Sequence, residues 1–60
     1  MIKLANADQK GEYYRIKRTA IVGYWRNKAN WTVVLLDTGN QLLVEERLKQ
    51  LDDLFVPTNV

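Results

Sequence analysis

The spacing of the apolar residues changes once along this 60-residue chain, at Val44. Before Val44, apolar and polar side chains tend to alternate, which is typical of strands whose successive side chains point to opposite faces. After it, Leu48, Leu51 and Phe55 follow at four, seven and eleven residues, the spacing of one face of an α-helix. We therefore predict an α+β fold, with a small antiparallel β-meander of four to five short strands and one C-terminal helix packed on the sheet.

The same patterns give the expected boundaries within a single domain that covers residues 1–60. Strands are expected at about 2–4, 12–17, 19–26, 31–36 and 41–44, and the helix at about 45–55. Residues 12–26 leave two alternatives, one long strand bent near Arg18 and Thr19 or two strands with a tight break. Gly23 indicates a bulge or a close backbone approach, and Gly39 a hairpin turn with a positive φ.

The charges of the predicted helix are unevenly placed. Glu45 and Glu46 fall in its expected first turn, where carboxylates complement the helix dipole. Asp52 and Asp53 lie near its end, where the dipole disfavours them, so we expect basic groups of the same chain or of a partner to compensate them. Pro57 prevents the helix from continuing far past Phe55.

Residues 31–36 (Trp-Thr-Val-Val-Leu-Leu) form the strongest predicted strand, and Thr32 is its one polar residue. A strand that is apolar on both faces usually has cover on both faces. We expect the helix on one side and another subunit on the other. A chain this short also has a thin core, so we predict a homo-oligomer or a tight complex with a partner.

Several function classes are excluded or disfavoured by composition. The chain has no cysteine and no histidine, so disulfides and the common Cys/His zinc sites are excluded. Its three glycines are isolated and form no phosphate-binding loop, and the adjacent pairs Glu45/Glu46 and Asp52/Asp53 do not face each other on a helix. We predict no enzyme activity, no cofactor and no metal site. No apolar run approaches the roughly 20 residues that span a membrane, and we expect a cytoplasmic protein.

Basic and aromatic residues are concentrated together in the first half of the chain. The first 31 residues carry a formal charge of +5 and the remaining 29 carry −3, while five of the six aromatic residues lie in the basic part. Cations suit phosphates and flat rings suit bases. The predicted nucleic-acid-binding residues are Tyr13, Arg15, Lys17, Arg18, Trp25, Arg26 and Lys28. Trp25 is the expected recognition residue, whereas Trp31, at the start of the apolar strand, is expected in the core.

Two functions remain open on this basis. The first is a small non-enzymatic nucleic-acid-binding or regulatory protein that uses a basic and aromatic sheet face to bind DNA or RNA, although a net charge of +2 is small for this role. The alternative is a protein-binding inhibitor, adaptor or assembly module that acts through a sheet edge or the C-terminal helix. An acidic protein partner would suit the same basic surface.

The stretch from Trp31 to Leu51 has the order strand, glycine turn, strand and helix. In this respect it resembles the ending of LytTR-type DNA-binding domains and small flagellar-cluster proteins of the FlbD kind. The resemblance consists of the hydrophobic pattern and Gly39. No functional residue is carried over from it.

Overall fold

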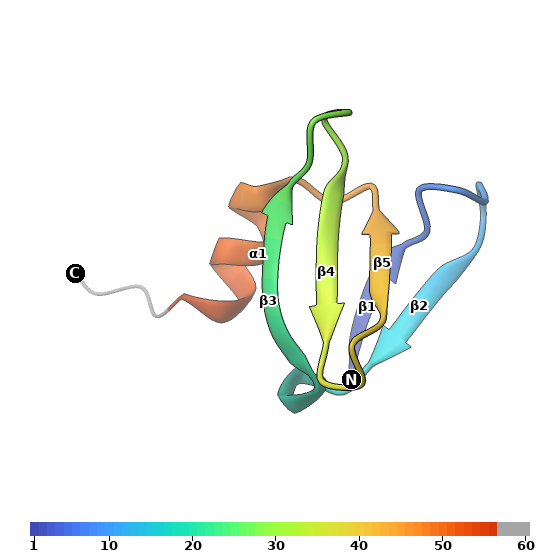
Figure 1. Cartoon of the computed structure of the whole chain (residues 1–60). Helices are drawn as coiled ribbons and strands as arrows, with labels where there is room; N and C mark the ends of the chain where they lie inside the picture. The colour runs from blue at the N-terminus through green and yellow to red at the C-terminus, as the bar shows by residue number, and fades with distance from the viewer. Residues whose placement is uncertain (57–60) are drawn as a thin grey trace.

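The computed structural model describes residues 1–56 and contains the predicted small α+β fold (Figure 1). The elements follow in the order β1 (Ile2–Ala5), β2 (Tyr13–Ile16), a 3-10 turn η1 (Arg18–Ala20), β3 (Ile21–Arg26), β4 (Thr32–Leu36), β5 (Gln41–Val44) and α1 (Leu48–Phe55). Strands β1 and β2 form one antiparallel sheet, and β3, β4 and β5 form a second in that order. The α+β prediction is therefore confirmed.

The two sheets are joined where β1 leaves its own sheet. Asn6 forms an antiparallel bridge with Val44 at the end of β5. The amide of Glu45 donates to the carbonyl of Ala5 at 2.9 Å, and the amide of Ala7 donates to the carbonyl of Leu43 at 3.0 Å. Strand β1 consequently lies behind β5, and the two-stranded sheet crosses behind the three-stranded one (Figure 1).

A single core fills the space between the sheets and the helix. Both sheets and α1 contribute its buried members, which are Leu4, Ile16, Val34, Val44 and Leu51. Tyr24 and Phe55 border this core with ring centroids 5.7 Å apart, which places α1 against β3. The alternation of the strands and the helical spacing therefore direct their apolar residues into one space.

The structure resolves the two alternatives for residues 12–26. The 3-10 turn Arg18–Ala20 separates β2 from β3, so this segment is two strands. A register shift between Ile21 and Gly23 gives the bulge that Gly23 indicated. Gly39 has a φ of 91° in the β4–β5 turn, as that hairpin prediction required.

The predicted start of the helix was wrong. Helix α1 begins at Leu48 with Arg47 as its N-cap, so Glu45 and Glu46 precede it. The side-chain oxygen of Gln50 accepts the backbone N–H of Arg47 at 2.8 Å, and the Glu46 carboxylate accepts the N–H of Ala5. Glu46 thus links the segment before α1 to β1, and it does not lie in the first turn of the helix, where it would interact with the helix dipole. Pro57 lies outside the described residues.

Candidate nucleic-acid interface

The outer side of β1–β2 carries an exposed basic surface. Lys3 lies opposite Arg15 in the register of the two strands, and Lys17 follows directly after β2. The Nζ atom of Lys3 lies 4.3 Å from the ring centroid of Tyr13, a cation–π arrangement. We call Lys3, Tyr13, Arg15 and Lys17 the basic face. It brings together the three β2-region residues predicted from sequence and adds Lys3 to them.

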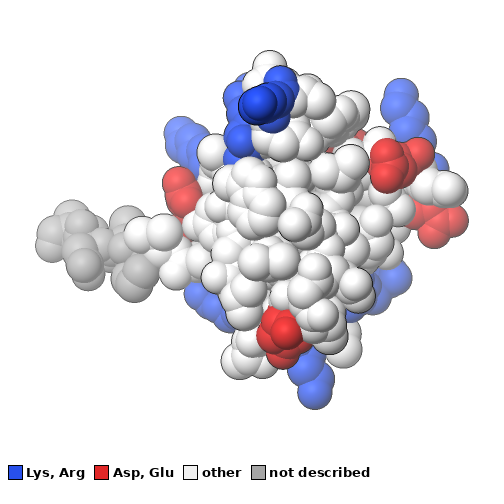
Figure 2. Space-filling model, in the orientation of Figure 1, with Lys and Arg blue, Asp and Glu red and all other residues white. Residues whose placement is uncertain are grey.

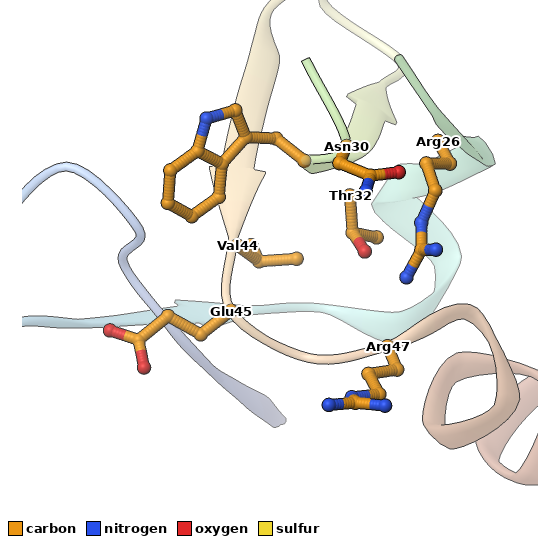
Figure 3. A pocket seen from close by; sticks show the side chains of 7 residues that line it. Arg26, Asn30, Thr32, Val44, Glu45 and Arg47 are labelled. Atoms are coloured by element: carbon orange, nitrogen blue, oxygen red, sulfur yellow. The ribbon is translucent and has the colours of Figure 1, made fainter. Parts of the chain in front are cut away.

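A hollow of about 360 Å³ lies where the β3–β4 loop faces the segment that precedes α1. Arg26 at the end of β3 and Arg47 in the segment before α1 are both among its lining residues, and the side chain of Arg26 points toward that segment (Figure 3). Both arginines are exposed, and Trp31, Asn30 and Thr32 are also among its lining residues. Two guanidinium groups beside an indole combine phosphate binding with a surface for base stacking.

A second hollow of about 330 Å³ adjoins the first and shares Trp31 and Glu45 with it. Its other lining residues are Ala7 and Lys10 from the loop between β1 and β2. Trp31 is 43% exposed between the two hollows. We call the two together the groove, with Arg26 and Arg47 at one end and Lys10 at the other. Among the lining residues of the described part of the chain, Glu45 is the one carboxylate, and its charge disfavours an anion at this point.

Local hydrogen bonds hold Trp31 in this position. The N–H of Trp31 donates to the side-chain oxygen of Asn27 at 2.9 Å, and the N–H of Asn27 donates to the carbonyl of Trp31 at 2.9 Å. Asn30, with a φ of 71°, completes the loop. Trp31 therefore lies in the loop before β4 begins at Thr32, and the prediction that it belongs to the core was wrong.

Three of the predicted binding residues lie outside the groove and the basic face. Trp25 is 38% exposed and lies opposite Val33 on the far side of the three-stranded sheet from the core. Arg18 lies against the helix, with its guanidinium 5.4 Å from the Phe55 ring centroid. It donates a hydrogen bond to the carbonyl of Leu54. Lys28 is exposed in the β3–β4 loop, near the groove in sequence but not among its lining residues.

The contacts of Arg18 and Tyr24 bear in part on the expectation that basic groups compensate Asp52 and Asp53. Arg18 places a cation at the last carbonyls of α1, where the dipole favours it. The hydroxyl of Tyr24 donates to the Asp52 carboxylate at 2.6 Å, and this hydrogen bond raises the pKa of Tyr24 above 10.0. Asp52 thus accepts a hydrogen bond from a phenol of the same chain, in place of the basic group that was expected.

Sequence reasoning missed the contributions of Lys10, Trp31 and Arg47 to the groove. Arg47 is 21 positions after Arg26 and belongs to the acidic part of the chain, so charge segregation concealed it. The signal for Trp31 was its position directly after the polar run 26–30, which already indicated a hairpin loop. Within residues 1–56, no three acidic side chains come together to hold a metal ion, and no helix of that part is long and apolar enough to cross a membrane.

Comparison with protein-family models, with curated proteins and with solved structures finds no match to this chain. The resemblance to the ending of LytTR-type domains therefore rests on the hydrophobic pattern and Gly39.

Proposed function

We propose that this protein binds single-stranded nucleic acid along the groove and the basic face. The observation that carries the proposal is that Arg26, Arg47 and the exposed indole of Trp31 line one hollow. Each guanidinium group would hold a phosphate, and an unpaired base would stack on the indole. A base inside a duplex offers no free face for this contact, which favours a single strand.

The arrangement of the cations supports a path for several nucleotides. Lys10 lies beyond Trp31 in the adjoining hollow. The basic face begins on β2 after the loop that contains Lys10. A backbone that follows these cations would meet Trp31 in the groove and Tyr13 on β2. Alternation of rings and cations along one path is the usual chemistry of proteins that bind single strands without strong sequence preference.

The test uses Trp31 as its own reporter. A Trp25→Phe variant leaves Trp31 as the single indole, and its fluorescence is followed while oligo(dT) or oligo(U) is added at several salt concentrations. We expect quenching and an affinity that falls steeply with salt. Trp31→Ala should weaken binding by about 1–3 kcal/mol, the usual value of one stacked base.

The charge variants separate phosphate contacts from general electrostatics. Replacing Arg26 and Arg47 together by Gln should lower the slope of log affinity against log salt by about 1.4, which is about 0.7 for each phosphate on a single strand. Lys49→Gln, an exposed change on α1 outside the groove, is the control and should leave the slope nearly unchanged. Polyglutamate provides the charge without bases. If polyglutamate binds as well as the oligonucleotide, and Trp31→Ala weakens neither, an acidic protein is the ligand and this proposal fails.

A further inference from the structure

The outward side of the three-stranded sheet carries no charge along its centre. Trp25 on β3, Val33 and Leu35 on β4 and Leu43 on β5 all lie on the side away from the core, since their strand neighbours Tyr24, Val34 and Leu42 contact it. We call these four residues the apolar face. Figure 2 views the molecule from this side and shows a broad uncharged area over the sheet.

No layer of this chain covers the apolar face within residues 1–56, because α1 and the β1–β2 sheet both lie on the other side (Figure 1). Val33 is nevertheless only 3% exposed. Its two cross-strand neighbours, Trp25 and Leu43, flank it. Trp25 remains 38% exposed, and Val22 in the bulge of β3 remains 60% exposed. The residues of the apolar face therefore pack against one another, while the outer side of the face stays exposed to solvent. An exposed apolar surface of this kind is expected for a sheet that packs against another sheet.

Among the charges that surround this face are two exposed residues of opposite sign at its two ends. Lys28 is exposed in the β3–β4 loop at one end, and Asp37 is exposed in the β4–β5 turn at the other. Figure 2 shows a basic group at the top, over the β3–β4 loop, and an acidic group at the bottom. A two-fold axis that lies between two such sheets, perpendicular to their strands, brings Lys28 of each copy toward Asp37 of the other. A two-fold axis parallel to the strands would bring like charges together.

We propose that the apolar face packs against the same face of a second copy of this chain, with the strands of the two copies antiparallel. A second copy is the occupant that fits both properties, because it is uncharged where this face is uncharged and has the opposite charge at each end. Polyanions such as nucleic acid have no cation to contact at the centre of the face. This proposal is independent of nucleic-acid binding, which uses the groove and the basic face.

The first experiment measures the mass in solution by sedimentation equilibrium at micromolar to submillimolar concentration. We expect twice the 7.0 kDa of the chain. Trp25→Ser should raise the dimer dissociation constant more than tenfold, because aromatic residues at the centre of an interface are common hot spots. Trp31→Ser removes the other tryptophan, outside the apolar face, and should leave the mass unchanged. A parent protein that is monomeric at all these concentrations would overturn the proposal.

The second experiment tests the orientation with charge changes in exposed loops, where the fold tolerates them. Lys28→Asp alone and Asp37→Lys alone should each raise the dissociation constant about tenfold at low salt, since each creates two like-charge contacts in the dimer. The double variant K28D/D37K restores both pairs and should return to the parent value. High salt should remove these differences but not the association itself. If a dimer forms and the double variant is as weak as the single ones, the proposed arrangement is wrong.

Discussion

The two sheets of this protein have the same inner chemistry and opposite outer chemistry. Leu4 on β1 and Val34 on β4 are both fully buried in one core. On the outside, the β1–β2 sheet presents the basic face, whereas the β3–β4–β5 sheet presents the apolar face. The alternation of each strand decides which residues enter the core. The outward-facing residues decide what each sheet can bind. The proposed ligand of the basic face is a polyanion, and the proposed partner of the apolar face is a second copy of the chain.

The groove lies near the corner where these two sheets meet. Residues from the β1–β2 loop, the β3–β4 loop and the segment before α1 contribute to it. The backbone contacts between residues 5–7 and residues 43–45 join the sheets close to this position. Proposed ligand binding should therefore depend on the junction of the sheets, while proposed self-association should depend on one sheet alone.

The largest effect should come from Leu4→Ala, which tests whether the two sheets share one core. Leu4 is fully buried and lies on β1, whereas both tryptophans lie in or beside the other sheet. We expect a loss of about 2–5 kcal/mol in the free energy of unfolding. Urea unfolding followed by tryptophan fluorescence and by circular dichroism should shift together. Lys3→Ala, on the same strand but exposed, should change stability by less than about 0.5 kcal/mol. Separate transitions for the two probes would show that the sheets unfold independently.

The junction of the sheets should account for the next largest effect. Both carboxylate oxygens of Glu46 accept the backbone N–H of Ala5, at 2.9 and 3.0 Å, and this contact is partly buried. Glu46→Ala should cost about 1.5–3 kcal/mol, the usual value for hydrogen bonds to a charged group. Glu45→Ala is the matched control, because Glu45 is exposed and lines the groove. It should preserve stability and strengthen oligonucleotide binding by removing a negative charge. Equal thermal stability of the two variants would contradict the role given to Glu46.

A smaller effect, on binding alone, is expected from the basic face. Arg15→Ala combined with Lys17→Ala should lower the salt slope of oligonucleotide binding by about 1.4, if each contacts one phosphate on a single strand. Stability should change within about 0.5 kcal/mol because both side chains are exposed. Salt-dependent titration and thermal unfolding of the same samples measure the two quantities. An unchanged slope would restrict the nucleic-acid path to the groove.

Much of this fold followed from the sequence because its signals are local. Alternation placed the inner residues of the strands, and Gly23 and Gly39 marked the bulge and the hairpin turn. The start of α1 was not predictable in this way. Its N-cap is Arg47, whose side chain has no hydrogen-bond acceptor, and the Glu46 carboxylate is hydrogen-bonded to the distant strand β1. Because Glu46 contacts Ala5, which is 41 positions away, the residues around the start of the helix carry no sequence pattern that marks it.

The basic face was largely predictable, and the groove was not. Tyr13, Arg15 and Lys17 alternate along one strand region, so their common side follows from strand geometry. Arg26 and Arg47 line the same hollow only because the chain reverses twice between them, through β4 and β5. Long-range juxtaposition of this kind is a property of the fold.

The smallest effect is expected from Tyr24, which lies on the core side of β3. Its strand neighbour Trp25 points to the opposite side of the sheet and belongs to the apolar face. The Tyr24 hydroxyl donates to Asp52 at 2.6 Å, which raises the pKa of Tyr24 above 10.0. Below pH 10 the phenol keeps its proton in both the folded and the unfolded chain, and the contact contributes fully. As the pH rises further, the unfolded chain loses this proton first, so the contribution decreases until the pH passes the pKa of the folded state.

Tyr24→Phe should therefore lower the free energy of unfolding by less than about 1 kcal/mol at neutral pH, because the contact is exposed to solvent. The difference from the parent should shrink as the pH rises above 10, and the proposed dimer should be unaffected. Urea unfolding of both proteins between neutral pH and about pH 11 measures this difference. Tyr13→Phe is the matched control, because it removes a tyrosine hydroxyl on the basic face, where Tyr13 lies against Lys3. Parallel curves for the parent and Tyr24→Phe across this range would show that the contact with Asp52 does not stabilise the attachment of α1 to β3.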